Sequence, residues 1–426
     1  MKTDILIVGT GCAGLYCALN LPKDKKITLI TKSDVESSDS FLAQGGICVL
    51  RDSDDYESFF EDTLRAGHYE NDRDSVHIMI SSSRSVINDL LDCGVEFDRR
   101  EDGSLDYTCE GAHSKNRILY HEDVTGKEIT SKLLDAVRAL PNAEILEKTT
   151  LLDIIEDEEG CCGAVVAISD GSAVTVSAGC VVLATGGIGG LFKHSTNFRH
   201  LTGDALAIAI KHNVELKNID YIQIHPTTFY TKDSDERSFL ISESVRGEGA
   251  KLYNSRMERF TDELLPRDKL TAAINKQMEE DGTEFVWEDL RTIPKDELFR
   301  HFPNIVDHCR SHGIDVTREC VPVVPAQHYF MGGIKIDHSG KTSMKGLYAV
   351  GETACNGVHG RNRLASNSLL ESLVFAKRAA QDIISLGYIA RILPLIDMSQ
   401  YTDPKSLEAD YRKTVLNEIK RRSEHV

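Results

Sequence analysis

The sequence predicts an α/β fold: a Rossmann-like dinucleotide-binding domain with an inserted α+β capping domain and a short C-terminal helical segment. The chain opens with a strand, a glycine turn and a helix at residues 3–14, and two later apolar strands, at 181–187 and 346–352, also run into glycines. Between them, from about residue 218 to 324, charge rises and the strand–glycine pattern is absent. The 426 residues are enough for about two or three domains.

The stretch TDILIVGTGCAG at residues 3–14 combines a buried parallel strand, a glycine turn and the start of an apolar helix. Gly9 allows the tight turn, Gly11 lets the backbone approach a pyrophosphate, and Gly14 lets the helix pack on the strand. The helix that begins at Cys12 then presents free N–H groups and its positive end to phosphates. An ordinary glycine-rich turn is the alternative, but the position between strand and helix favours a dinucleotide site.

The second strand, at 27–31, ends in Thr31 and Lys32. Many folds of this kind place an Asp or Glu there to bind the ribose hydroxyls. The sequence therefore argues against NAD and suggests that Lys32 lies near adenosine or phosphate. The stretch DSFLAQGGI, at 39–47, permits a close backbone approach to a flat ligand through Gly45 and Gly46, with a surface loop as the alternative.

Hydrophobic spacing and turn signals predict the remaining elements. Helices are expected at 54–93, 126–140, 204–211, 369–386 and 405–422, and strands at 144–155, 162–169 and 173–183. Gly94 is expected to end the first of these helices. Asn367 or Ser368 is expected to cap the helix at 369–386, whose positive end is a further site for negative charge. Asp204 stands where an N-cap is expected, which is the alternative to a binding role.

Composition narrows the function. The net charge of −18 argues against a nucleic-acid-binding surface, and an anionic ligand would need a local cluster of Arg and His. Eleven cysteines are scattered without a C-x-x-C motif, no targeting segment precedes the first strand, and no apolar run is long enough for a membrane span, so a reduced cytoplasmic protein is expected. Cys161 and Cys162 are expected at a hairpin tip without a basic neighbour, which argues against a redox function. No metal is expected, because no carboxylates or cysteines complete a site around His301, His308 and His312.

A series of motifs follows in order along nearly the whole chain: GTGCAG, AQGGI, LATGG, HPTTF, SESVRGEGA, LLPRD, PAQHYFMGGI, GLYAVGE and HGRNRLASNSLLES. Together they resemble the flavoproteins of the fumarate reductase/succinate dehydrogenase superfamily and, within it, the L-aspartate oxidases. The resemblance implies an FAD-binding domain at 1–218 and 330–396 and a capping and substrate domain at 219–329. It also implies a truncated C-terminal helical segment at 397–426, where that family usually continues into a helical bundle.

The resemblance implies that the cofactor is FAD, held without a covalent link. The dehydrogenase flavoproteins carry a flavin-linked His shortly before A-Q-G-G, whereas this chain has Asp39 near that place and no His between Lys32 and Gln44. The residues expected to contact FAD lie in the first glycine turn, around A-Q-G-G and at the starts of later elements: Gly9, Thr10, Gly11, Cys12, Ala13, Gly14, Lys32, Asp39, Ser40, Phe41, Leu42, Ala43, Gln44, Gly45, Gly46, Asp204, Glu352, Ser368 and Leu369.

The resemblance also implies a small dicarboxylate substrate, L-aspartate or fumarate. His225, Ser242, His328 and Arg363 match the positions that hold its carboxylates, and an Arg can do so through two parallel hydrogen bonds. Glu110 stands in E-G-A-H-S, where the dehydrogenases have G-G-Q-S. A carboxylate at that place could pair with the ammonium group that distinguishes aspartate from succinate.

Arg267 matches the acid/base arginine of the superfamily, and Glu243 and Arg246 match the other members of an Arg–Glu–Arg proton relay in the fumarate reductases. A free guanidinium is a poor base because its pKa exceeds about 12. In aspartate oxidation the relay is therefore expected to act mainly through its charges. An ion-pair network without a catalytic role is the alternative for these residues.

The activity that the resemblance implies is oxidation of L-aspartate to iminoaspartate, by hydride transfer from Cα to flavin N5, with oxygen or fumarate as electron acceptor. This would be the first step of quinolinate and NAD synthesis, with a hand-off of iminoaspartate to quinolinate synthase. A soluble fumarate reductase, a flavoprotein subunit that docks an iron–sulfur partner and a non-catalytic FAD-binding protein are the alternatives. Neither nucleic acid nor a membrane span is expected.

Overall fold

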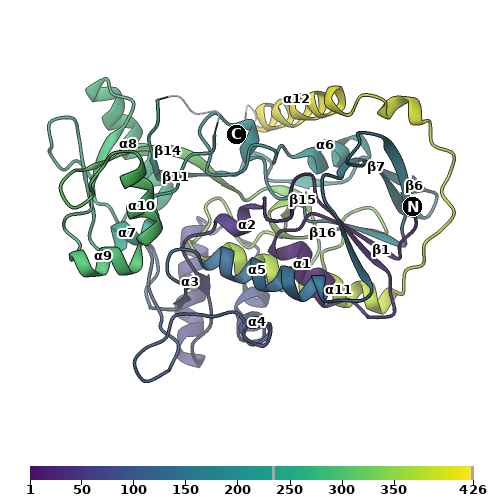
Figure 1. Ribbon diagram of the computed structural model, residues 1–426, viewed down its shortest axis with the longest axis horizontal. Coiled ribbons are helices and arrows are strands. Elements are labelled where there is room, and N and C mark those ends of the chain that lie inside the picture. Colours follow the sequence, from purple (N-terminus) through teal and green to yellow (C-terminus); the bar gives the residue numbers. More distant parts are fainter. Residues whose placement is uncertain (233–235, 424–426) are drawn as a thin grey trace.

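A five-stranded parallel sheet forms the centre of the larger part of the molecule (Figure 1). The computed structural model describes residues 1–232 and 236–423. Burial on both faces explains why the inner strands of this sheet at 5–8 and 180–183 are continuous apolar runs. In spatial order they are β16 (Leu347–Ala349), β9 (Cys180–Leu183), β1 (Ile5–Val8), β2 (Ile27–Ile30) and β5 (Ala143–Leu146). All the predicted strand–glycine elements thus lie in one sheet, and the predicted α/β class is confirmed.

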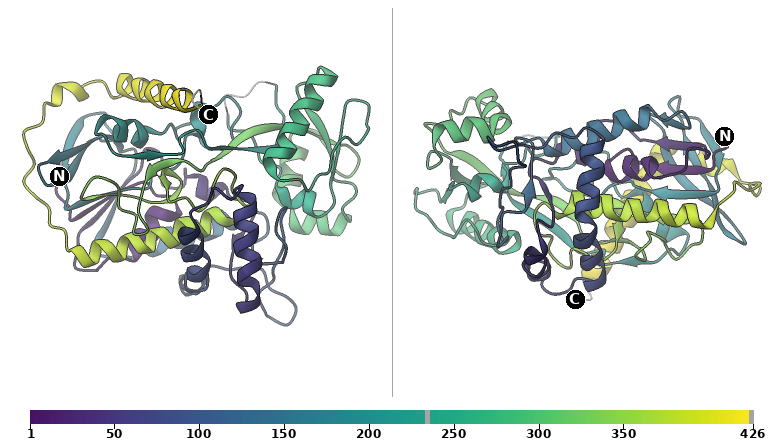
Figure 2. Two further views of the ribbon diagram at one scale, coloured as in Figure 1. Left: turned by 180° about the vertical axis from the view of Figure 1, so that it is seen from behind. Right: turned by 90° about the horizontal axis from the view of Figure 1, so that it is seen from below.

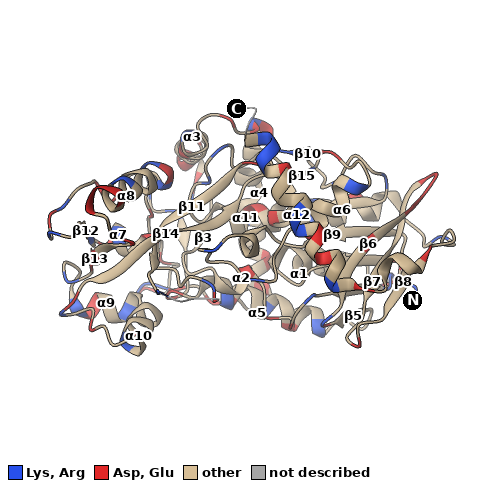
Figure 3. Ribbon diagram, turned by 90° about the horizontal axis from the view of Figure 1, so that it is seen from above, with Lys and Arg blue, Asp and Glu red and all other residues tan. Residues whose placement is uncertain are grey.

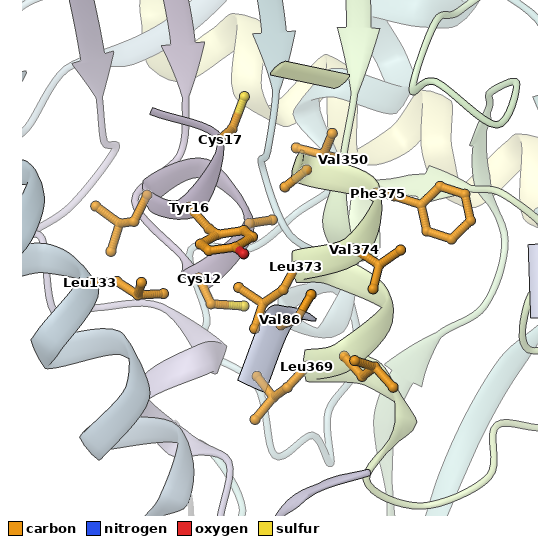
Figure 4. Close-up of a cluster of buried hydrophobic side chains, with 14 of the residues drawn as sticks. Cys12, Tyr16, Cys17, Val86, Leu133, Val350, Leu369, Leu373, Val374 and Phe375 are labelled. Atoms are coloured by element: carbon orange, nitrogen blue, oxygen red, sulfur yellow. The ribbon is translucent and has the colours of Figure 1, made fainter. Parts of the chain in front are cut away.

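Helices cover one face of this sheet. The helix at 12–19, after the glycine turn, packs between the helices at 125–138 and 367–386. Its Cys12 and Tyr16 lie beside Leu373 and, from a fourth helix, Val86 (Figure 4). The helices on this side are α1 (Cys12–Leu19), α3 (Tyr56–Ala66), α4 (Arg73–Asp92), α5 (Thr125–Arg138) and α11 (Asn367–Leu386). Because strand side chains alternate, Ile5 and Ile7 of β1 face this helical core, and Leu6 and Val8 face the opposite one.

The opposite face of the sheet is covered by α6 (Asp204–Lys211), by α12 (Pro404–Ser423) and by a three-stranded antiparallel sheet. Figure 2 shows α12 and α11 on opposite sides of the molecule. The strands of the antiparallel sheet are β6 (Thr150–Asp157), β7 (Gly160–Ala167) and β8 (Ala173–Ser177). The predicted strands 144–155 and 173–183 are therefore each two strands, because the chain passes from one sheet to the other within them.

Several local predictions need correction. The helical run expected at 54–93 is two helices, because residues 67–72 form a turn in which His68 and Tyr69 adopt positive φ. Cys161 and Cys162 lie inside β7, not at a hairpin tip, and Arg391 donates from Nη2 to the Cys161 carbonyl at 3.2 Å, so a basic neighbour is present. Burial raises the pKa of Cys161 to about 12.

The helix starts also differ from the expectation. Gly94, at φ +85°, follows α4 as predicted. At α11 the flanking residue is Ser366, at φ +60°, and Asn367 is already helical. Gly203 flanks α6, so Asp204 is the first helical residue and not the cap.

A second body is built on residues between 222 and 330 and has its own core (Figure 1). Its antiparallel sheet has the order β11 (Ile222–Phe229), β14 (Val321–Phe330), β13 (Val286–Asp289) and β12 (Lys251–Tyr253). Its helices are α7 (Glu243–Gly247), α8 (Arg267–Asp281), α9 (Lys295–His301) and α10 (Pro303–Ser311). β11 and β14 run from this body back to the larger one. The domain boundaries at 218, 329 and 396 stay predictions.

Short elements complete the larger body. They are α2 (Asp39–Leu42), β3 (Ile47–Cys48), β4 (Ile118–Leu119), β10 (Leu216–Lys217), β15 (Gly333–Lys335) and β17 (Ala354–Cys355). Acidic and basic residues are interspersed along outer helices such as α8 and α12 (Figure 3). Among the described residues, none of the helices combines the length and apolar character needed to cross a bilayer.

Candidate functional site

One elongated cavity begins at the carboxyl ends of the central strands and continues to the junction with the second body. The carboxyl edge of a parallel sheet is the usual ligand site of such folds. Of the predicted binding and catalytic residues, all but Gly14, Phe41 and Arg246 line this cavity. The structure therefore brings together residues from 8 to 372 around one space.

The glycine turn forms one end of the cavity. Gly9 has φ +118°, and a Cβ there would lie 2.0 Å from the Ala184 carbonyl oxygen. A Cβ on Gly14 would lie 2.1 Å from the carbonyl oxygen of Gly9, so Gly14 serves the close packing of α1 on β1 and stays behind the cavity wall. Gly11 precedes α1 without a side-chain cap, and the Cys12 amide donates to Ser40 Oγ at 3.1 Å.

Polar atoms without partners line the middle of the cavity. Among the described residues, the side chains of Ser38, Asp39 and Gln44 each bury an oxygen that has no hydrogen-bond partner. Buried polar atoms are nearly always paired in folded proteins. Three such atoms on one wall indicate a polar ligand that completes them.

Two carboxylates share this middle section. The Asp39 carboxylate accepts from the Phe198 amide at 2.9 Å, and that of Glu352 accepts from the Phe330 amide at 2.9 Å. Burial raises the pKa of Asp39 to about 7, and burial together with the charge of Asp39 raises that of Glu352 to about 8. Hydrogen bonds from the hydroxyl groups of a ligand would stabilise the ionised form of these two buried carboxylates.

Lys32 lies at the outer side of the cavity. Its Nζ is 2.6 Å from Asp204 Oδ2 and 3.6 Å from Glu408 Oε1 of α12. Thr202 donates to the other oxygen of Asp204 at 2.7 Å. The lysine and Asp204 thus form one ion pair at the predicted adenosine or phosphate position.

Two arginines meet at the opposite end of the cavity. Arg267, the first residue of α8, donates from Nε to Glu243 Oε2 at 2.6 Å and from Nη1 to Gln223 Oε1 at 2.9 Å. Arg363 donates from Nε to the same Gln223 oxygen at 3.2 Å and from Nη1 to Ser368 Oγ. Burial, and then the neighbouring Arg267, lower the pKa of Arg363 to about 10, so both arginines are cations at neutral pH.

Gln223 is a site residue that the sequence analysis missed. It lies on β11 two positions before His225, so strand alternation places both side chains on one face. Its Nε2 donates to Asn362 Oδ1 and to the Arg363 carbonyl, each at 2.8 Å, which fixes the amide between the two arginines. The alternation of side chains along the strand could have paired Gln223 with His225. It could not show that this face of the strand contacts Arg267 and Arg363.

Two histidines complete the cationic end. The rings of His225 and His328 lie edge to face with centroids 5.1 Å apart. His328 Nδ1 is hydrogen-bonded to Thr196 Oγ1 at 2.7 Å, and His225 Nε2 is buried without a partner among the described residues. Burial, and then the charge of Arg267, hold the pKa of both histidines well below the usual range. They are neutral donors that face the space between the arginines.

Glu110 adds a second carboxylate to this end, beside the Glu243 that pairs with Arg267. Its side chain is 6% exposed, and it accepts from Ser366 Oγ at 2.6 Å and from Ser244 Oγ at 3.1 Å. Burial and the nearby Glu243 raise its pKa. Ser242 also lines the cavity, and its Oγ accepts from the Ser244 amide at 3.3 Å to cap α7.

Arg246 does not line the cavity. It lies behind Glu243, 2% exposed, and donates from Nη1 to Thr227 Oγ1 at 2.5 Å and from Nε to the Glu263 carbonyl at 3.2 Å. Burial alone would raise the pKa of Glu243, but the charges of Arg267 and Arg246 hold it below its usual value. Glu243 is therefore an anion between two cations.

The three histidines considered for a metal lie apart from this site. His301 pairs with Glu248 at 2.8 Å, and His308 stacks on Phe239 with ring centroids 3.6 Å apart. His312 lies against His308. Among the described residues, none group with carboxylates or cysteines as a metal site would require.

Comparison with known proteins gives concordant matches. A family model described as FAD binding domain matches residues 4–369. The chain is 50% identical to an L-aspartate oxidase of Clostridium perfringens, covering 98% of this chain and 94% of that protein. It is 49% identical to an L-aspartate oxidase of Clostridium acetobutylicum, covering 92% and 90%. Among solved structures, the FrdA chain of E. coli quinol fumarate reductase has a TM-score of 0.85 at 28% identity, covering 99% of this chain and 74% of that one.

Proposed function

This chain belongs to the L-aspartate oxidase family of FAD-binding flavoproteins, and we propose that it oxidises L-aspartate to iminoaspartate. The observation that carries this proposal is the convergence of Arg267, Arg363, His225 and His328 on the cavity end that also holds Glu110. Arg363, Arg267 (paired with the anion Glu243) and the two neutral histidines suit two carboxylates, and the second anion, Glu110, suits one ammonium group. L-Aspartate has this combination of groups.

The rest of the cavity fits FAD, which when bound supplies the acceptor for a hydride. The turn at 9–13 and the start of α1 would hold the pyrophosphate. Asp39 and Glu352 would accept from hydroxyls, and the unpaired oxygens of Ser38 and Gln44 would gain partners. We propose that the link is non-covalent, so acid precipitation should release free flavin.

Arg363, His225 and His328 would orient the substrate by its carboxylates, so that its Cα–H bond faces the hydride acceptor. Such fixed orientation supplies much of the rate gain in a transfer of this kind. Glu110 would bind the ammonium group, and its raised pKa makes it a better base than an ordinary carboxylate. The Cα–H bond would give up its electron pair with the hydride, one N–H proton would pass to Glu110, and the electron pair of that N–H bond would form the C=N bond of protonated iminoaspartate.

Arg267 would act mainly through its charge during this oxidation, because a guanidinium is a poor base. When fumarate is the electron acceptor, a proton must reach carbon. We propose Arg267, which is hydrogen-bonded to Glu243 at 2.6 Å, as the donor for that step. This pair supports fumarate reduction as a second activity.

Anaerobic mixing of the holoenzyme with L-aspartate tests the proposal. L-Aspartate should bleach the yellow flavin absorbance, and L-asparagine, which lacks the second carboxylate, should leave it unchanged. Oxygen or fumarate should then restore the colour. No bleaching by L-aspartate at any concentration would refute the proposed oxidation, and recovery with fumarate but never with oxygen would favour the fumarate reductase alternative.

We further propose that the product enters quinolinate and NAD synthesis through a hand-off to quinolinate synthase, because an imine hydrolyses in water and is best consumed at once. A cytoplasmic location is proposed with it. The eleven free cysteines, most of them buried, support a reducing compartment.

A further inference from the structure

Glu288 occupies a position where a charged carboxylate is costly. It lies on β13, is 0% exposed, and its cross-strand neighbours Leu252 and Val321 are buried apolar residues. Neither carboxylate oxygen has a hydrogen-bond partner in the described part of the chain. An ionised carboxylate without partners in such a place is strongly disfavoured. Burial accordingly raises the pKa of Glu288 to about 7.

Glu263 links the position of Glu288 to the arginine behind the active site: its carbonyl accepts from Arg246 Nε at 3.2 Å, and its side chain accepts from the amide of Leu252, the cross-strand neighbour of Glu288, at 3.1 Å. The acidic groups that act on Arg246 are Glu243 first and Glu288 next. Arg246 is itself buried, so its charge is balanced by these neighbours and not by solvent. We call the buried groups Arg267, Glu243, Arg246 and Glu288 the row; Arg267 and Glu243 line the cavity, and Arg246 and Glu288 lie in the core of the second body.

Three titratable groups face Glu288 from the elements packed around it. Arg246 of α7 favours its ionised form, and Glu263, in the loop before α8, opposes ionisation. Glu263 is held as an anion by Arg259, 2.8 Å away. Burial, and then the charge of Glu288, raise the pKa of Cys309 in α10 to about 12, so this thiol stays neutral. Glu288 is therefore the member of this group whose charge is poised to change.

We propose that Glu288 couples the binding of a dicarboxylate to the uptake of a proton. With Glu288 protonated the row has one excess positive charge, and with Glu288 ionised the row is neutral. An anionic ligand beside Arg267 stabilises the positively charged state, because opposite charges in a low-dielectric interior attract strongly. Binding then draws a proton onto Glu288, and Glu288 acts through Arg246 as a residue that sets substrate affinity. This coupling rests on the proposed dicarboxylate substrate.

Fumarate binding to the oxidised holoenzyme tests the coupling, because fumarate stays fully ionised from pH 6 to 8.5 and no turnover occurs without a reductant. The dissociation constant, followed by the change in flavin absorbance, should rise about tenfold over this range, which corresponds to about one pKa unit of coupling. Calorimetry in buffers of different ionisation enthalpy should show that the wild-type protein takes up part of a proton near pH 7.5. The same readout in Glu288→Gln separates the contribution of Glu288 from those of Glu110, Asp39 and Glu352, whose pKa values are also raised.

The Glu288→Gln variant fixes the row in its positive state. Its dissociation constant for fumarate should change much less over the same range than that of the wild type, and its proton uptake should fall by the share that Glu288 contributes. Glu297→Gln, a substitution at an exposed position of α9, is the matched control and should behave as wild type. An unaltered pH dependence in Glu288→Gln, or no proton uptake by the wild-type protein, would overturn the coupling. Failure of fumarate to bind the wild-type holoenzyme at any pH would instead refute the dicarboxylate site, and the coupling with it.

Discussion

Replacing Glu110 by Gln separates recognition of the ammonium group from recognition of the carboxylates. The amide has nearly the size of the carboxylate and can still bond to the hydroxyls of Ser366 and Ser244, which now lie 2.6 and 3.1 Å from it. The substitution therefore removes one negative charge and leaves the packing in place. Aspartate loses its ionic partner, whereas fumarate has no ammonium group to lose one.

The expected magnitude follows from burial. Removing one member of a buried, hydrogen-bonded charge pair costs about 2–5 kcal/mol. The lower end applies here, because burial and Glu243 already raise the pKa of Glu110, so its anion carries a cost in the free enzyme. About 2 kcal/mol corresponds to a loss of about 30-fold in kcat/KM for aspartate from the ammonium contact alone, and loss of the proposed proton acceptor adds to it. Fumarate reduction should change less than about threefold, and any change should favour the variant, since a negative charge beside a dianion is removed.

The assay is anaerobic flavin reduction by L-aspartate and, separately, fumarate reduction by the reduced enzyme. Ser244→Ala, which removes one hydrogen bond to Glu110 and keeps the charge, is the control and should affect both reactions similarly. Equal losses of aspartate and fumarate activity in Glu110→Gln would show that Glu110 does not recognise the ammonium group.

Three further substitutions test other parts of the account. Gly9→Ala should lower both Tm and FAD content, because a Cβ at this position would lie 2.0 Å from a carbonyl oxygen. Gly103→Ala is the control: Gly103 also has a positive φ but has open space around it, so this variant should lower Tm slightly and keep its FAD. Equal FAD content in the two variants would contradict the packing reason. Gln223→Leu should reduce kcat/KM for aspartate about 100-fold, since two charge-assisted hydrogen bonds together contribute about 3 kcal/mol, and wild-type kinetics would remove its positioning role. Burial would lower the pKa of His212, but its bonds to Asp153 and Glu156 raise it. Protonated His212 thus stabilises the fold at pH values below its pKa in the unfolded chain, and this stabilisation is lost as the pH rises through its pKa in the folded protein. The difference in unfolding free energy between wild type and His212→Gln, measured by urea titration, should therefore shrink above about pH 7. A difference that does not change with pH would contradict this role of His212.

Motifs with a single backbone requirement were predictable from the sequence. Gly9 must take a positive φ, and Gly14 must let α1 approach β1, and both residues do so for the reason the motif gives. The turn at Asp170 and Gly171 follows from the same local chemistry. Such features need no knowledge of distant parts of the chain.

Features that depend on distant contacts were not predictable. The break between α3 and α4 at 67–72 is held by residues near 360: the Gly67 carbonyl accepts from the Arg361 amide at 3.1 Å, and Asn71 donates to the Val358 carbonyl at 2.7 Å. Gln223 belongs to no motif that the sequence reveals. Its role depends on Arg267 and Arg363, which are distant in the sequence and lie beside it only in the folded chain. The hydrophobic spacing of residues 54–93 indicates neither the helix break at 67–72 nor the role of Gln223.

A crystal structure of the holoenzyme with succinate, a dicarboxylate without the ammonium group, tests the central claim most directly. The account predicts that one carboxylate of succinate lies within hydrogen-bond distance of Arg363, that the pair His225 and His328 contacts the carboxylates, and that Arg267 faces the carbon chain over the flavin. Succinate bound elsewhere, with these four side chains contacting only one another, would contradict it.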